Sequence, residues 1–287
     1  MPHIETTWEL LMSQQLRDLW TMQLWATAGF FGLCLIEGLF ARKKRKLKPP
    51  PELVTDMFYW LTGPSVRVLS RMLVFALLQG LVLLAGLHAG PELLDGFGPL
   101  AQQPKALIVV EALLIMDFAG YWTHRAFHQI PLLWRFHAVH HSAKHIRWAT
   151  TGRVHPVNEI ANFSAAVIPV FLLGLPLGVV LPLIPLVMLY AMSAHLPFNL
   201  DYGPLRYVMV SPLFHRWHHT YLAEGCDKNF GNGFSIWDAL FGTFYLPPDR
   251  LPHTFGVDAD DIEESYVSQL LYPFRRRARS AAVATER

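Results

Sequence analysis

The sequence predicts an all-α integral membrane protein, a bundle of about four transmembrane helices with a cytoplasmic, histidine-rich helical cap. Of the 287 residues, 52% are hydrophobic and 16% are charged, whereas about a quarter of a soluble domain is charged. Several apolar stretches approach the roughly 20 residues that a helix needs to cross hydrocarbon. Fourteen histidines, most of them in tight clusters, complete the pattern. We therefore treat residues 1–287 as a single membrane domain.

Two apolar stretches in the first third of the chain are good spanning segments. Residues 20–36 contain no ionisable side chain apart from the thiol of Cys34, and residues 72–89 are interrupted only by His88. A third stretch, 106–116, contains Glu111 and is followed by Asp117. Because a carboxylate is costly in lipid, we expect both of these acidic groups to face protein.

A helical hairpin is predicted for residues 160–200, which include no Lys, Arg, Asp or Glu. One continuous helix of that length would be much longer than a bilayer is thick. The sequence from Gly174 to Gly178 alternates glycine, leucine and proline, which is typical of a turn. A buried helix pair in a soluble protein is the alternative, and the other apolar stretches disfavour it.

Basic segments indicate the orientation. Six Lys or Arg residues lie in 42–48, and four Arg residues begin a basic, flexible tail at 275–287. The positive-inside rule places both in the cytoplasm, in a bacterial inner membrane or the endoplasmic reticulum. Counting spans from the first basic segment then puts every histidine cluster on the cytoplasmic side.

The histidine clusters predict a metal site. Their members are His124 and His128, then His137, His140 and His141, then His215, His218 and His219. One HxxHH motif is expected by chance only about 0.03 times in such a chain, and this chain has two. On a helix, positions i, i+3 and i+4 fall within about 100° of arc, so each cluster can face one way. Eight imidazoles exceed one tetrahedral zinc site, which favours a dinuclear centre of iron, zinc, copper or nickel.

Other residues near the clusters are weighed singly. His195 would return to the cytoplasmic layer after the hairpin, as a ligand or as an interface histidine. His155 could be a ligand or could orient one, with Glu159 as its own partner. Three further carboxylates could orient imidazoles, or could act as helix caps or ion-pair partners: Asp117, Asp201 and Asp238.

These motifs resemble the fatty acid hydroxylase superfamily, the sterol desaturase-like integral membrane oxygenases. The resemblance rests on the order HxxxH, HxxHH, HxxHH and on the closing segment 229–243, NFGNGFSIWDALFGT. It covers roughly residues 106–245, which would form the catalytic region. It implies a cytoplasmic cap that holds two metal ions, iron in the active enzyme, over helices that admit a lipid. Zinc can replace iron in a purified sample because it binds more tightly than Fe(II).

The resemblance also implies a division of the ligands. One metal would be held by His140, His195, His215 and His218, and the other by His124, His128, His137, His141 and His219. It further implies O2 as co-substrate, a lipid substrate, and electrons from a separate donor protein.

Several functions remain open at the level of the sequence. Hydroxylation of a fatty acyl, sterol or related long chain is the leading hypothesis, with desaturation or alkylglycerol-ether cleavage as alternatives. A membrane zinc hydrolase or a metal transporter is the alternative from another class. We expect no nucleic-acid partner, and the sequence leaves the lipid, the attacked carbon, the electron donor and the oligomeric state open.

Overall fold

The computed structural model describes residues 52–84, 92–221, 225, 227–257 and 262–275, together with four isolated residues, 21, 28, 29 and 32. Apart from those four residues, the expected first span at 20–36 lies outside the described part, as do the basic segment at 42–48 and most of the basic tail. The described part is helical apart from loops and one isolated bridge between Thr220 and Phe255. This agrees with the predicted all-α membrane bundle.

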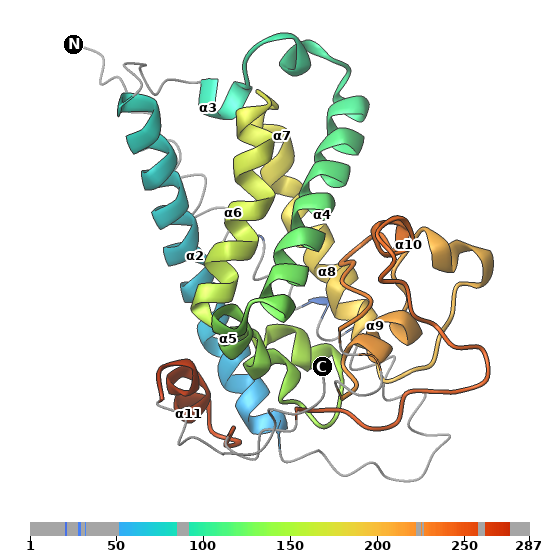
Figure 1. The fold of residues 1–287 in the computed structure, drawn as a ribbon. Coiled ribbons are helices and arrows are strands. Elements are labelled where there is room, and N and C mark those ends of the chain that lie inside the picture. Colours follow the sequence, from blue (N-terminus) through green and yellow to red (C-terminus); the bar gives the residue numbers. More distant parts are fainter. Residues whose placement is uncertain are drawn as a thin grey trace.

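The bundle is formed by α2, α4, α6 and the segment from α7 to α8, as Figure 1 shows. The helices and 3-10 helices (η) are α2 (Leu53–Leu84), α3 (Glu92–Asp95), η1 (Pro99–Gln102), α4 (Lys105–Gln129), α5 (Pro131–His141), η2 (Trp148–Gly152), α6 (Pro156–Leu172), α7 (Leu177–Val180), η3 (Leu181–Leu183), α8 (Ile184–Ala194), η4 (Gly203–Tyr207), α9 (Pro212–His218), α10 (Ile236–Leu240), α11 (Tyr266–Leu271) and η5 (Tyr272–Phe274).

Among the described residues, three helical segments are long and apolar enough to cross a membrane: Leu53–Leu84, Lys105–Gln129 and Leu177–Ala194. Helix α6, Pro156–Leu172, is apolar but shorter, and it lies between α2 and α4 (Figure 1). The outward side chains of α2 are largely leucines, such as Leu61, Leu69 and Leu81, which are 62–75% exposed. In water such a surface would be costly, so its natural surrounding is lipid.

The buried core of the bundle joins α2, α4, α6 and the 175–181 segment. Its centre is formed by Val74, Ile108, Ala112, Val167 and Val170, each at most 2% exposed. These residues recur at helical spacing on each helix, which places one apolar stripe of each against its neighbours.

Helix α2 differs from the span expected at 72–89, because it begins at Leu53 and has 32 residues. At 1.5 Å per residue it is about 48 Å long, well beyond a hydrocarbon core of about 30 Å. Its first turns therefore belong to the cap, where Asp56 accepts a hydrogen bond of 2.7 Å from the fully buried Arg153. A search for apolar stretches detects only the lipid-facing part of such a helix.

The hairpin turn between α6 and α7 lies where the sequence predicted it. Gly174 has φ +80°, and its carbonyl accepts a hydrogen bond of 2.8 Å from the amide of Phe97. A Cβ at Gly174 would lie 2.2 Å from the carbonyl oxygen of Phe97. Only glycine fits this conformation and this close approach, so the residue fixes the end of the bundle opposite the cap.

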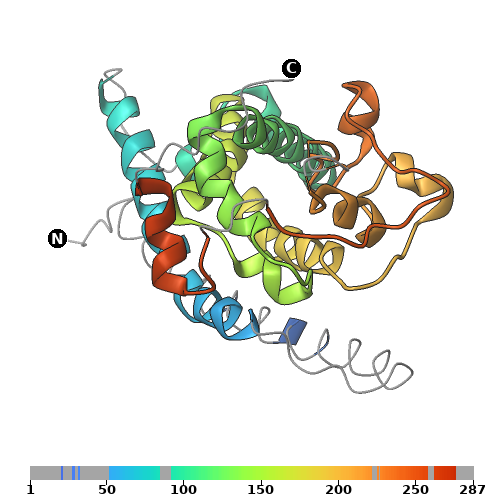
Figure 2. The ribbon, with the colours of Figure 1, turned by 60° about the horizontal axis from the view of Figure 1, so that its bottom comes forward.

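The cap gathers α5, η2, α9, α10 and α11 at the other end of the bundle, and Figure 2 views the molecule with this end forward. Helix α5 follows α4 after a sharp break at Ile130, where Pro131 begins the new helix. Helix α9 begins at Pro212, and the hydroxyl of Ser211 caps it by accepting a hydrogen bond from the amide of Phe214. The HxxHH motifs occupy the last turns of α5 and α9.

Candidate metal centre

Nine buried histidines form two adjacent groups in the cap. The first group contains His124, His128, His137, His141 and His218, and the second contains His140, His195, His215 and His219. Within each group one nitrogen atom per residue lies within 4.8 Å of the others. All nine side chains are at most 8% exposed. In the described part of the chain, both groups consist of histidine alone.

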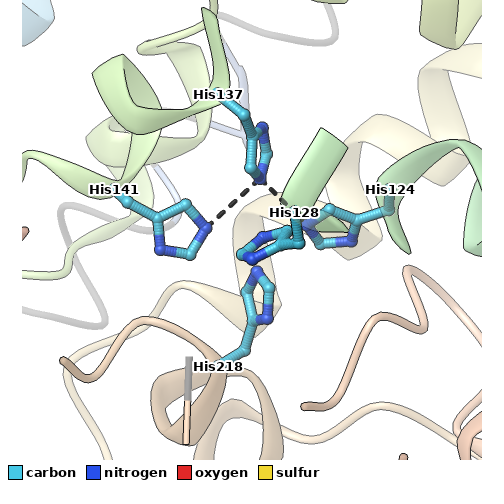
Figure 3. A group of neighbouring side chains, drawn as sticks. All are labelled: His124, His128, His137, His141 and His218. Atoms are coloured by element: carbon cyan, nitrogen blue, oxygen red, sulfur yellow. Dashed lines mark hydrogen bonds between the residues drawn. The ribbon is translucent and has the colours of Figure 1, made fainter. Parts of the chain in front are cut away.

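The first group draws on α4, α5 and α9, and Figure 3 shows its five imidazoles converging on a common space. The Nε2 atom of His137 lies 3.0 Å from Nε2 of His124 and 3.2 Å from Nε2 of His141. The Nε2 atom of His218 is buried and has no hydrogen-bond partner among the described residues. A buried nitrogen without a partner is costly in a folded protein unless it binds something.

The second group is centred on His195, the residue that ends α8. Its Nε2 atom lies 2.9 Å from that of His215, 3.2 Å from that of His219 and 3.3 Å from that of His140. The structure thus brings His195 to the HxxHH motifs, as the family resemblance implied.

The division between the groups corrects the one we expected, because His218 and His219 exchange places. Around a helix axis, residue i+4 lies about 40° from residue i, and residue i+3 lies about 60° away on the other side. His215 and His219 therefore face one group, while His218 turns to the other. The same rule separates His140 from His137 and His141 on α5. Each HxxHH motif gives its outer histidines to one group and its middle histidine to the other.

Oxygen acceptors orient six of the nine imidazoles through Nδ1. Carbonyl and amide oxygens can only accept, so Nδ1 carries the proton and Nε2 presents its lone pair to the group. The acceptors are the carbonyls of Phe230 for His124 (2.9 Å), Arg153 for His140 (3.2 Å), Ala191 for His195 (2.8 Å) and Lys228 for His218 (2.8 Å), the amide oxygen of Asn158 for His137 (2.7 Å), and the carboxylate of Asp227 for His128 (3.2 Å). Such partners fix the tautomer and the ring orientation of a metal ligand.

The sequence interpretation missed these acceptors. Four of them are main-chain carbonyls, which any residue carries, so no side-chain pattern could have revealed them. Asn158 lies in the HPVNE segment that we had singled out for His155 and Glu159, one position before the carboxylate that we chose.

Four of the five residues expected to orient imidazoles have other hydrogen-bond or ion-pair partners in the structure, and the fifth is Glu159. His155 caps α6 by accepting from the amide of Val157, and its Nε2 donates to the carbonyl of Leu270. Asp201 pairs with Arg206 at 2.5 Å. Glu159 lines a separate cleft on the α2 side of α6. Ion pairing was an alternative weighed for the carboxylates, and it describes Asp201. The capping role of His155 was not expected from the sequence.

Asp117 and Asp238 influence the histidines indirectly, because they hold the backbone of the loop at 229–235. Asp238 accepts hydrogen bonds of 2.7 Å from the amides of Phe230 and Gly231. Asp117 accepts from the amides of Gly233 and Phe234. These two carboxylates fix the loop whose carbonyl at Phe230 orients His124.

Burial keeps the imidazoles neutral. It lowers the pKa of His195 to about 4, and it lowers the pKa of His215 and His219 well below the usual 6.5. Neighbouring imidazoles add to the effect, because a second positive charge nearby is unfavourable. Neutral imidazole is the form that binds a metal ion, so the donor atoms, their number and their protonation all fit two metal ions.

Comparison with known proteins gives a family and several relatives. The fatty acid hydroxylase family matches residues 109–243. The chain is 36% identical to the ornithine lipid hydroxylase OlsE of Rhizobium tropici over 183 residues, which are 63% of this chain and 55% of that protein. It is 31% identical over 163 residues to the alkylglycerol monooxygenase of Danio rerio, covering 57% of this chain and 36% of that protein. The human alkylglycerol monooxygenase is 32% identical over 49% of this chain and 31% of its own length. The chain thus spans about half or less of these relatives, and no solved structure matches it significantly.

Proposed function

Through residues 109–243 the chain belongs to the fatty acid hydroxylase family, and on that premise we propose that it is a membrane-bound diiron oxygenase. It would use O2 and external electrons to hydroxylate a lipid. The observation that supports this most is the pair of buried, all-histidine groups at one end of an apolar bundle. At this position a lipid held by the apolar helices could reach a metal site that is shielded from water.

The two groups would each hold one iron ion, the first with five imidazoles and the second with four. Iron bound there would supply the O2-dependent oxidation that an unactivated C–H bond requires. The protein's own part is to hold the ligands in fixed orientations and to exclude water, which the buried imidazoles and their Nδ1 acceptors do. The apolar helices would hold the substrate chain so that one carbon reaches the centre, and proximity would then set the site of attack.

The names of the relatives suggest the substrate class that we propose. One relative is named for ornithine lipid and others for alkylglycerol, so a polar lipid with long chains fits this chain best. Ether oxidation of an alkylglycerol is the second candidate, favoured by the alkylglycerol monooxygenases. A zinc hydrolase or a metal transporter is less well supported. A zinc hydrolase needs about three protein ligands, fewer than the nine histidines here. A transporter needs ligands along a pathway through its spans, whereas these histidines gather in the cap.

The cap would face the cytoplasm, where a separate electron-donor protein can reach it. This orientation rests on the basic segments at 42–48 and 275–279 and on the positive-inside rule. Iron is the proposed native metal, and O2 is the proposed co-substrate.

Lipid mass spectrometry of cells with and without the protein tests the proposal. A lipid that gains the mass of one oxygen atom supports hydroxylation, whereas loss of two hydrogen atoms indicates desaturation, and cleavage of an alkylglycerol indicates ether oxidation. The variants His140→Ala and His218→Ala each remove one ligand, from the second and the first group respectively, and both should abolish the change. An unchanged lipid profile in iron-loaded membranes that contain the folded protein would refute the proposed oxygenase. Full turnover by either variant would refute the diiron assignment.

A further inference from the structure

Arg153 lies between η2 and α6 and is fully buried. Its guanidinium donates hydrogen bonds from Nε to the carboxylate of Asp56 (2.7 Å) and from Nη1 to the hydroxyl of Ser142 (3.1 Å). Asp56, in the first turn of α2, is itself only 3% exposed. Moving two charges out of water is costly, and apolar residues of similar volume often stabilise a protein equally well. Stability alone therefore explains this buried ion pair poorly.

The main chain of Arg153 reaches the candidate metal centre. Its carbonyl accepts a hydrogen bond of 3.2 Å from Nδ1 of His140, a member of the second histidine group. Arg153 has φ −73° and ψ 73°, and the amide of Val154 donates to the carbonyl of Gly152 at 2.8 Å. This conformation is an inverse γ-turn. The carbonyl of Arg153 therefore lies in a loop, where no helical ladder fixes its direction.

The guanidinium of Arg153 anchors this loop on two sides. Its bond to Asp56 ties the loop to α2. Its bond to Ser142 ties the loop to the C-terminal end of α5, where the hydroxyl of Ser142 in turn donates to the carbonyl of Val139 at 2.7 Å. One residue thus holds both the end of the helix that carries His140 and the carbonyl that orients its ring.

Other main-chain acceptors of imidazoles show what such an anchor does. The carbonyl of Ala191 lies within α8, where the helix fixes it. The carbonyl of Phe230 lies in a loop, and the carboxylate of Asp238 holds that loop through two amides. The loop at Arg153 is held in turn by the carboxylate of Asp56. In each of these two loops a buried carboxylate fixes the acceptor of an imidazole.

We infer that Arg153 is a positioning residue for the second metal group and that its ion pair with Asp56 serves this task. The ion pair fixes the carbonyl, and the carbonyl keeps the proton on Nδ1 of His140. Nε2 then presents its lone pair to the metal ion. Because Asp56 belongs to Leu53–Leu84, the second group is also fastened to a membrane-spanning helix. This role rests on the proposed metal centre, so its test measures metal affinity rather than turnover.

The test measures each histidine group separately in full-length, metal-free protein. His137→Ala leaves the second group complete, and His215→Ala leaves the first group complete, so each background reports on one group. Co(II) is the probe, because imidazole ligands bind it and sites of this kind hold it more tightly than Fe(II). Bound Co(II) is measured by equilibrium dialysis over a range of free concentrations.

Asp56→Val combined with Arg153→Met replaces the ion pair by apolar side chains of similar total volume, which leaves no unpaired buried charge. In the His137→Ala background this double substitution should lower Co(II) affinity about 10- to 100-fold, the usual effect of losing a partner of a ligating histidine. In the His215→Ala background it should leave Co(II) affinity unchanged. The melting temperature of the metal-free protein should stay the same or rise, which separates positioning from folding.

Asp56→Asn is the conservative variant, because its amide oxygen can still accept from Nε of Arg153. It should cause a smaller loss of Co(II) affinity, again confined to the second group, and it decides the question if the double substitution prevents folding. The control, Glu263→Gln with Arg275→Gln, removes an exposed ion pair of the cap and should change neither group.

Full Co(II) affinity of the second group without the ion pair would overturn the inference, because the pair would then serve stability alone. An equal loss in both groups would overturn it as well. Failure of the wild type to bind two Co(II) ions is a different result, since it would refute the proposed metal centre itself.

Discussion

At the scale of single residues, the orientation of six of the nine imidazoles depends on one oxygen atom each, outside the two histidine groups. The nine histidines could be counted in the sequence, and the resemblance added His195 to the eight in clusters. The acceptors at Phe230, Arg153 and Lys228 could not be predicted, because a carbonyl is positioned by the fold of its loop and leaves no mark in the residue type.

Asn158 is the amide side chain among these acceptors, and it can be removed cleanly. Asn158→Ala should lower iron affinity or turnover by about 10- to 100-fold, the usual effect of losing a partner of a ligating histidine. Asn158→Asp keeps an acceptor 2.7 Å from Nδ1 of His137 and should restore most of the activity. Asn199→Ala, which removes only an exposed bond to Arg216, is the matched control. Equal activity of Asn158→Ala and Asn199→Ala would contradict the assigned role.

The depressed pKa values predict how the metal-free protein responds to acid. An imidazole with pKa 6.5 when unfolded and about 4 when folded, as for His195, binds more protons in the unfolded state between these values. Its contribution to the free energy of unfolding is therefore complete above pH 6.5 and is lost as the pH falls toward 4. Melting temperatures of metal-free protein should be constant from pH 8 to about 6.5 and fall steeply below it. A flat profile down to pH 4 would show that these imidazoles are exposed to solvent.

At the scale of elements, helical geometry explains both a success and an error. Spacing predicted that the three imidazoles of each HxxHH motif face one side of their helix, and each motif does contribute to the two adjacent histidine groups. The division by family resemblance placed His218 and His219 in the wrong groups, although the 40° and 60° offsets from His215 already distinguish them.

Helix boundaries were harder to predict. The start of α2 at Leu53 depends on the buried pair between Asp56 and Arg153, which lies 97 positions apart in the sequence.

The hairpin turn is an element whose sequence requirement can be tested. Gly174→Ala should lower the free energy of unfolding by about 1 to 3 kcal/mol from backbone strain at φ +80°. The close approach of the added Cβ to the carbonyl of Phe97 should lower it further. Gly80→Ala is the control, since Gly80 lies within α2 with open space around its Cβ position. That variant should be neutral or stabilising by up to about 1 kcal/mol. Thermal unfolding in detergent measures both, and a loss of stability in Gly80→Ala equal to that in Gly174→Ala would contradict the argument.

At the scale of the whole molecule, the bundle and the cap have separate tasks. Hydropathy and spacing predicted a membrane bundle with a histidine-rich cap, since both depend on local composition. The way the cap is fastened to the bundle could not be predicted, because it depends on contacts distant in sequence, such as the hydroxyl of Thr55 donating to the carbonyl of Glu264 at 2.8 Å. The loop at 229–235 likewise joins α4 to the cap through Asp117. Rigid fastening of this kind keeps the centre at a fixed height above the lipid.

The crossed arrangement of the HxxHH motifs has a thermodynamic consequence. Because α5 and α9 each contribute to both groups, the first ion to bind would immobilise side chains and backbone that the second ion also needs. The second ion would then bind with less conformational entropy left to lose, which is positive cooperativity. Titration of metal-free protein with Fe(II) should give a sigmoidal isotherm with few singly loaded molecules. Such a protein would switch between empty and fully loaded states over a narrow range of free iron.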